Sequence, residues 1–109
     1  MRGNIIQEAK SFIGDLRSAC NFGDDLFVVT VGLSRDGSAR NISVGMYDMK
    51  TGVLKREEQK NLYEKADRFA KFASSRYKGI KSIAILLTDE FEVSVFRTKG
   101  VLRICNLDA

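Results

Sequence analysis

The stretch Ile80–Leu107 constrains the fold of this chain more than any other part of the sequence. It contains three short apolar runs, Ile80–Leu87, Phe91–Arg97 and Val101–Leu107. The first run is almost continuously apolar, which is typical of a strand buried on both faces, and the second alternates between apolar and polar residues. Lys99-Gly100 separates the last two runs, and glycine there can adopt the positive φ of a hairpin turn. The stretch therefore predicts a three-stranded antiparallel meander whose first strand is central.

The N-terminal half of the chain predicts a helix followed by a β-hairpin. Apolar residues recur every three or four positions over Ile5–Cys20, after the candidate N-cap Asn4, which indicates an amphipathic helix of about 16 residues. Residues Leu26–Leu33 predict an apolar strand, and Arg40–Met49 a second strand whose polar alternation is typical of a sheet edge. The loop between them, residues 34–38, contains Asp-Gly, a strong turn signal.

A second amphipathic helix is predicted between the hairpin and the meander. It spans Glu57–Tyr77, after a charged connection at Val53–Lys60, and Gly79 is its predicted C′ residue. The element order is helix–strand–strand–helix–strand–strand–strand. We therefore expect an α+β fold in a single domain, residues 1–109, with a five-stranded, mostly antiparallel sheet and a helix on each face.

Several function classes lack the residues that they require. The chain has 109 residues and no histidine, so the commonest general base and metal ligand is missing. Neither GxGxxG nor GxxxxGK[ST] occurs, and the acidic pairs lie at predicted turns, which favour aspartate for backbone reasons. We therefore predict no catalytic residues, no cofactor, no metal site and no enzymatic activity.

The cysteines and the hydropathy pattern bear on the compartment. Cys20 and Cys105 fall on apolar positions of a predicted helix and strand, so we expect both thiols to be free and buried. No apolar run approaches the ~20 residues of a membrane span, and the N-terminus lacks a signal-peptide core. We expect a cytoplasmic protein without a membrane span.

The basic residues leave a nucleic-acid function open. The formal net charge is +4 at pH 7, and the sequence pI is about 9.2. Clustering of basic residues in the fold would create phosphate contacts, for which the candidates are Arg35, Arg40, Arg97, Lys99 and Arg103. No recognition helix, RNA-binding aromatic motif or zinc-finger spacing accompanies them.

Two segments, Phe27–Asp48 and Ser82–Leu107, give the chain a resemblance to the dynein light-chain/roadblock family. The first segment is two strands around an Asp-Gly turn, and the second is an apolar strand, an acidic turn, an alternating strand, a glycine turn and a final apolar strand. The resemblance implies a profilin-like sheet with helices on both faces and a non-catalytic, homodimeric scaffold or regulator, often of small GTPases or motor complexes. Many members have a third helix after the last strand, which this sequence lacks, so we expect part of one sheet face to be bare or covered by a partner.

The resemblance also implies where two subunits would meet. The dimer would use the second helix and the strand after it, so that one sheet continues across both subunits. If Ile80–Leu87 is an edge strand in the monomer, pairing with its symmetry mate would cover a long apolar edge. The expected interface residues are Tyr63, Phe72, Arg76, Ile80, Ser82 and Ile83.

Three function classes therefore remain open from the sequence. The first is a homodimeric protein-interaction module, with a small GTPase as one possible partner. The second is a basic nucleic-acid-binding protein. The third is an unrecognised enzyme or a small inhibitor of a nucleic-acid-processing machine.

Overall fold

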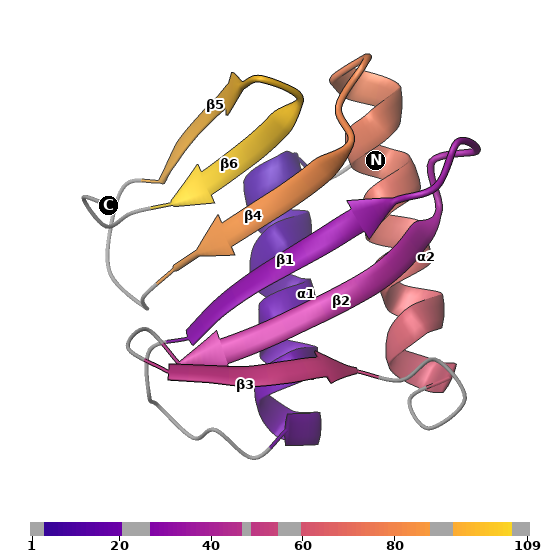
Figure 1. The fold of residues 1–109 in the computed structure, drawn as a ribbon. Helices are drawn as coiled ribbons and strands as arrows, with labels where there is room; N and C mark the ends of the chain where they lie inside the picture. The colour runs from indigo at the N-terminus through magenta and orange to yellow at the C-terminus, as the bar shows by residue number, and fades with distance from the viewer. Residues whose placement is uncertain (1–3, 21–26, 47–48, 55–59, 88–92, 106–109) are drawn as a thin grey trace.

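The computed structural model describes residues 4–20, 27–46, 49–54, 60–87 and 93–105 (Figure 1). They form two helices and six strands, in the order α1 (Ile5–Cys20), β1 (Phe27–Leu33), β2 (Ala39–Met46), β3 (Met49–Leu54), α2 (Lys60–Arg76), β4 (Ser82–Leu86), β5 (Ser94–Thr98) and β6 (Val101–Cys105). The α+β class and the mostly antiparallel sheet are confirmed. The sheet has one strand more than predicted.

The six strands lie in the order β3-β2-β1-β4-β6-β5. All neighbouring pairs are antiparallel except β4 and β6, which are parallel. The predicted meander is therefore wrong in its connectivity, because β6 is inserted between β4 and β5. The central place of β4 is confirmed, and the β5–β6 hairpin forms as predicted.

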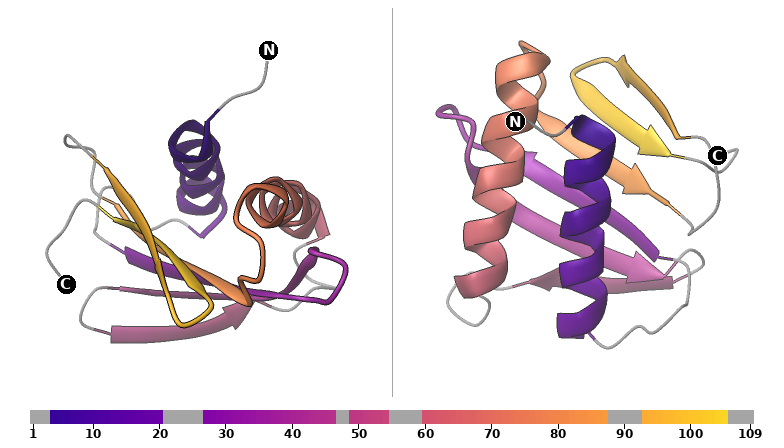
Figure 2. Two further views of the ribbon diagram at one scale, coloured as in Figure 1. Left: turned by 90° about the horizontal axis from the view of Figure 1, so that it is seen from above. Right: turned by 180° about the vertical axis from the view of Figure 1, so that it is seen from behind.

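Both helices pack on the same face of the sheet, and Figure 2 shows the opposite face without a helix. The helices contact each other directly, since the rings of Phe12 and Phe69 stack at 5.4 Å between centroids. Lys65 of α2 also forms an ion pair with Asp15 of α1 at 3.3 Å. The prediction of one helix on each face is wrong.

The physical reason lies in the alternation of side chains along the central strands. In β4, Ile83 and Ile85 are fully buried under the helices, whereas Ser82, Ala84 and Leu86 are only half-buried on the other face. A run that reads as continuously apolar thus contains one large-residue face and one face of mostly small residues. Only the first face requires a covering layer.

The additional strand, β3, lies where the sequence predicts the end of one strand and a charged connection. Its first residue, Met49, was expected to end the preceding strand, and its last residues, Val53 and Leu54, overlap the predicted connection Val53–Lys60. The pairing of β2 with β3 shifts so that Val44 lies opposite Gly52 and Gly45 opposite Lys50, which leaves Thr51 as the extra residue of a β-bulge. Thr51-Gly52, which closely follows the predicted strand Arg40–Met49, therefore lies at a bulge inside β3 and does not end a strand. Strand β2 consequently lies inside the sheet, although its polar alternation predicted an edge.

Helix α2 supplies hydrogen-bond acceptors to the beginning of β2. The Ile42 amide donates to the Tyr63 hydroxyl oxygen at 3.1 Å, and the Ala39 amide donates to Asp67 Oδ1 at 2.8 Å. Strand β3 pairs with β2 only from Ile42 onward, so residues 39–41 have no partner in β3. Two α2 side chains one turn apart thus satisfy backbone donors along this side of β2.

Several local signals are confirmed. Asn4 caps α1, because its Oδ1 accepts the Gln7 amide at 2.8 Å. Gly79 and Gly100 have φ of 84° and 82°, and Lys99 joins Gly100 in the left-handed region with φ 52°, as a tight hairpin turn requires. Cys105 is a free thiol but is half-buried instead of fully buried, and the side chain of Cys20 lies outside the described residues.

Candidate ligand-binding surface

We call the sheet face opposite the helices the open face. Within the described residues, no helix or strand covers it (Figure 2). The register places its residues in three rows across β2, β1, β4, β6 and β5: Gly45, Val28, Leu86, Cys105 and Ser94; Ser43, Thr30, Ala84, Arg103 and Phe96; Asn41, Gly32, Ser82, Val101 and Thr98. Most of these side chains are small, so another molecule can approach the backbone of this face closely.

Phe96 is the most unusual residue of the open face. Its side chain is 47% exposed, and among the side chains that the structure describes it is the only large hydrophobic one that is exposed. It lies directly opposite Arg103 in the β5–β6 pair, and that arginine is exposed as well. A solvent-facing aromatic ring next to a cation is a surface on which a flat or anionic ligand can bind.

Basic residues gather at one end of the sheet, which we call the basic end. It comprises the β1–β2 hairpin, the α2–β4 connection and the β5–β6 turn, with the residues Arg35, Arg40, Lys78, Lys81, Arg97 and Lys99. Backbone hydrogen bonds join these three loops, since the Leu33 amide donates to the Lys81 carbonyl at 2.9 Å and the Lys81 amide donates to the Gly100 carbonyl at 2.7 Å. The pairing of distant strands thus brings together cations that are far apart in the sequence.

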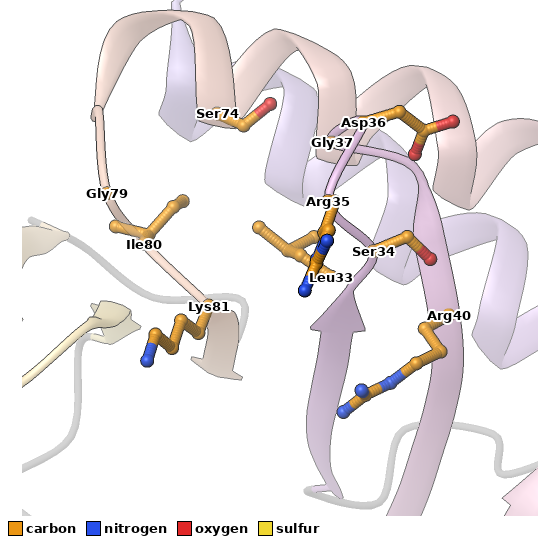
Figure 3. Close-up of a pocket in the computed structure, with 10 residues that line it drawn as sticks. All are labelled: Leu33, Ser34, Arg35, Asp36, Gly37, Arg40, Ser74, Gly79, Ile80 and Lys81. Atoms are coloured by element: carbon orange, nitrogen blue, oxygen red, sulfur yellow. The ribbon is translucent and has the colours of Figure 1, made fainter.

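A pocket of about 540 Å³ opens at the basic end between the β1–β2 hairpin and the start of β4 (Figure 3). Its lining comprises Leu33, Ser34, Arg35, Asp36, Gly37, Arg40, Ser74, Gly79, Ile80 and Lys81. Two nearly buried apolar side chains, Leu33 and Ile80, contribute to its walls, and the three basic side chains are exposed. The size is within the range of about 300–1,000 Å³ that is usual for small-molecule pockets.

Asp36 is the one acidic residue in the pocket lining. Its Oδ1 accepts the Ser38 hydroxyl at 2.6 Å and the Ser38 amide at 3.0 Å, and these hydrogen bonds hold the pKa of the Asp36 carboxyl below its ordinary value. Figure 3 shows this carboxylate turned away from the guanidinium groups of Arg35 and Arg40. Asp36 therefore shapes the hairpin, and among the described residues it forms no ion pair with Arg35 or Arg40, although its negative charge remains in the pocket lining.

Other cations near the basic end have structural partners. Arg97 Nη1 donates to the Lys78 carbonyl, which lies just beyond the C-terminal end of α2. The Arg76 guanidinium lies 4.6 Å from the centroid of the Phe72 ring. By contrast, Arg35, Arg40 and Lys81 form no ion pair with an acidic residue in the part of the chain that the structure describes.

The six residues expected at the dimer interface do not form one surface in the structure. Ser82 and Ile83 belong to β4, which pairs with β1 on one side and β6 on the other, and Ile80 is buried just before it. This stretch has no free edge for a symmetry mate. Tyr63 is 2% exposed and bonded to β2, so it is a core residue. Phe72 and Arg76 lie together near the end of α2. Their place in a dimer interface stays a prediction.

The candidate phosphate contacts are gathered at the basic end and on the open face. The structure places Arg35 and Arg40 at the pocket, Arg97 and Lys99 at the β5–β6 hairpin, and Arg103 on the open face. The sequence interpretation missed Phe96 as a site residue. For Phe96 a signal existed, because it is a large aromatic residue on the otherwise polar side of an alternating strand.

The described residues hold no group of three or more potential metal ligands, and none of their helices is long and apolar enough to span a membrane. Comparison with protein-family models, curated proteins and solved structures found no match for the chain. The interpretation of the surface therefore depends on its own geometry.

Proposed function

We propose that this protein is a non-catalytic module that binds single-stranded nucleic acid across the open face of its sheet. The observation that carries the proposal is the exposed ring of Phe96 beside Arg103, on an uncovered sheet face that adjoins the basic end. Of the function classes that the sequence leaves open, single-strand binding accounts for the exposed Phe96 ring, for Arg103 and for the basic end together.

The chemistry of single strands matches these features. Unpaired bases stack on aromatic side chains, and each stacked base contributes about 1–3 kcal/mol as judged by alanine substitution. Lysine and arginine contact the phosphates and release counterions. An open sheet face admits splayed bases, whereas duplex recognition would require an element that enters a groove. Arg103, Arg40 and Lys81 are exposed cations, and we expect the phosphates of a bound strand to contact some of them.

Fluorescence anisotropy with a short labelled oligouridylate tests this proposal. Phe96→Ala should weaken binding about 5- to 150-fold, which corresponds to one lost stack. Phe96→Tyr should retain most of the affinity because it retains the ring. Arg103→Gln should reduce the slope of log K against log[salt] by about 0.7, the value for one phosphate contact on a single strand.

The matched control is Arg68→Gln, which removes an exposed cation from α2, on the far side of the molecule from the open face. It should change affinity far less than Arg103→Gln. Equal losses in both variants would mean that net charge alone drives binding. A wild-type protein that does not bind at low salt, or a Phe96→Ala protein that binds normally, would refute the proposal.

A second candidate is the homodimeric protein-interaction module that the roadblock-like pattern implies. The observation in its favour is that β5 lies at the end of the sheet and has a strand neighbour on one side only. Addition of a strand from a partner, such as a second copy or a small GTPase, would use that edge. Light scattering at tens of micromolar would support this candidate if it gave a two-chain mass.

Either function fits a cytoplasmic protein, in which the free thiol of Cys105 would stay reduced.

A further inference from the structure

The outer edge of β5 has few of the features that block the pairing of another strand. Among the described strands, the sheet ends at β3 on one side and at β5 on the other. The pairing of β3 contains the bulge at Thr51, and bulges twist an edge away from further pairing. The pairing of β5 runs without a bulge from Ser94 to Thr98, and the chain contains no proline. The one charged residue of β5, Arg97, donates to the Lys78 carbonyl of its own molecule.

The β5–β6 hairpin determines which backbone groups of β5 point outward. Lys99-Gly100 is its two-residue turn, so Thr98 exchanges both backbone hydrogen bonds with its partner in β6. Such pairs alternate with non-hydrogen-bonded pairs along an antiparallel ladder. The amides and carbonyls of Val95 and Arg97 therefore point away from β6. In the part of the chain that the structure describes, no strand lies beside them.

The position of Phe96 makes this edge complementary to itself. Phe96 is the central residue of β5, and its ring lies on the open face with 47% of its surface exposed. Two copies of β5 that pair antiparallel about a two-fold axis at Phe96 would place Val95 of one copy opposite Arg97 of the other. The outward amides and carbonyls of both residues would then be hydrogen-bonded. The two Phe96 rings would be neighbours in a non-hydrogen-bonded pair, in which side chains approach most closely.

Neither the helices nor the charges oppose this pairing. Figure 2 shows β5 at the margin of the sheet, beyond both helices, so a second copy can approach the edge. A two-fold axis perpendicular to the sheet keeps the helices of both copies on one side and both open faces on the other. In this register Arg97 lies opposite the partner's Val95 and not opposite another cation. Arg103 is separated from the partner by the Phe96 ring, because it lies on β6.

We infer that a second copy of this chain pairs with the outer edge of β5, antiparallel and in register about Phe96, so that one sheet continues through both copies. The two open faces would be continuous, with a Phe96 ring and an Arg103 side chain from each copy at the junction. The inference rests on the free β5 edge of the second candidate function, to which it assigns one occupant. It does not depend on nucleic acid.

Disulfide cross-linking of the full chain tests the register. The two Cβ atoms of a non-hydrogen-bonded pair are close enough for a disulfide. Phe96→Cys should therefore give a two-chain band after mild oxidation, and reduction should remove it. Thr98→Cys is the matched control, because it lies on the same face of the same strand but opposite the partner's Ser94. It should cross-link no more than the wild type, whose own cysteines set the background.

Light scattering at tens of micromolar tests the pairing without a covalent bond. The wild type should have the mass of two chains. Phe96→Glu should have the mass of one chain, because its carboxylates would lie directly opposite each other. Ser75→Glu, which adds the same charge at an exposed position of α2, should keep the two-chain mass. Circular dichroism should show that both variants remain folded.

Two results would overturn the inference. The first is a wild type with the mass of one chain. The second is a two-chain mass that persists in Phe96→Glu while Phe96→Cys does not cross-link, and this result would leave the second candidate function standing with another interface. Stacking of bases on Phe96 is decided separately, by the binding of oligouridylate to Phe96→Ala.

Discussion

Tyr63→Phe removes one oxygen atom from the core and tests how α2 is joined to the sheet. The hydroxyl oxygen accepts the Ile42 amide at 3.1 Å, and the Tyr63 side chain is 2% exposed, so water cannot easily replace it. Leaving a buried donor unpaired costs about 1–3 kcal/mol. For a domain near 100 residues, that loss lowers the melting temperature by on the order of 4–12 °C.

The assay is equilibrium denaturation by urea, followed by circular dichroism, with Tyr77→Phe as the matched control. Tyr77 is half-buried just after α2, so its variant should change the free energy of unfolding by less than about 0.5 kcal/mol. An m-value equal to that of the wild type would show that the denatured state is unchanged. If the two variants have the same stability, the hydrogen bond to Ile42 does not contribute and the reasoning fails.

Three other predictions concern the hairpin and α2. Gly37→Ala places a Cβ 2.6 Å from the Ser74 hydroxyl at a residue with a φ of 87°. Gly79→Ala has a similar φ of 84°, but its Cβ would meet no atom within 4 Å. Denaturation should therefore show Gly37→Ala to be more destabilising than Gly79→Ala by about 1 kcal/mol. The folded state lowers the pKa of Asp36, so the ionised carboxylate stabilises the fold. This contribution of Asp36 is complete above the unfolded-state pKa and is lost as the pH falls through the folded-state pKa. Asp36→Asn should abolish this part of the acid sensitivity in pH-dependent denaturation. Phe72→Glu should convert a dimer that is built on α2 to monomer in light scattering while circular dichroism stays native, and an unchanged two-chain mass would exclude Phe72 from the interface.

The sequence predicts the local elements of this fold well, because their signals are local. The Asn4 cap, the Asp36-Gly37 hairpin and the Lys99-Gly100 turn each depend on the chemistry of a few neighbouring residues. The pairing of β4 with β6 does not depend on neighbouring residues in this way. The alternating pattern with Ile83 and Ile85 on one face is the same whichever strand lies beside β4. Which face the helices cover is likewise decided by packing between distant segments.

The candidate surface shows the same division. The sequence identified Arg35, Arg40 and Arg103 as cations, but only the topology shows that the first two share a pocket while the third lies on the open face. Tyr63 was expected at a dimer interface, because the helix pattern around it does not reveal that its hydroxyl accepts the Ile42 amide of β2. Hydrogen bonds between distant elements leave no periodic trace in the sequence.

The insertion of β6 between β4 and β5 has a consequence for the order of folding. Among the described strands, β5 pairs only with β6, so this hairpin can form by local contacts and then dock onto β4 through β6. Until it docks, β4 presents an unpaired apolar edge, which is the kind of surface that leads to misassembly. During synthesis the central sheet therefore cannot close until β6 has left the ribosome, and a chain truncated after Thr98 would keep that edge exposed permanently.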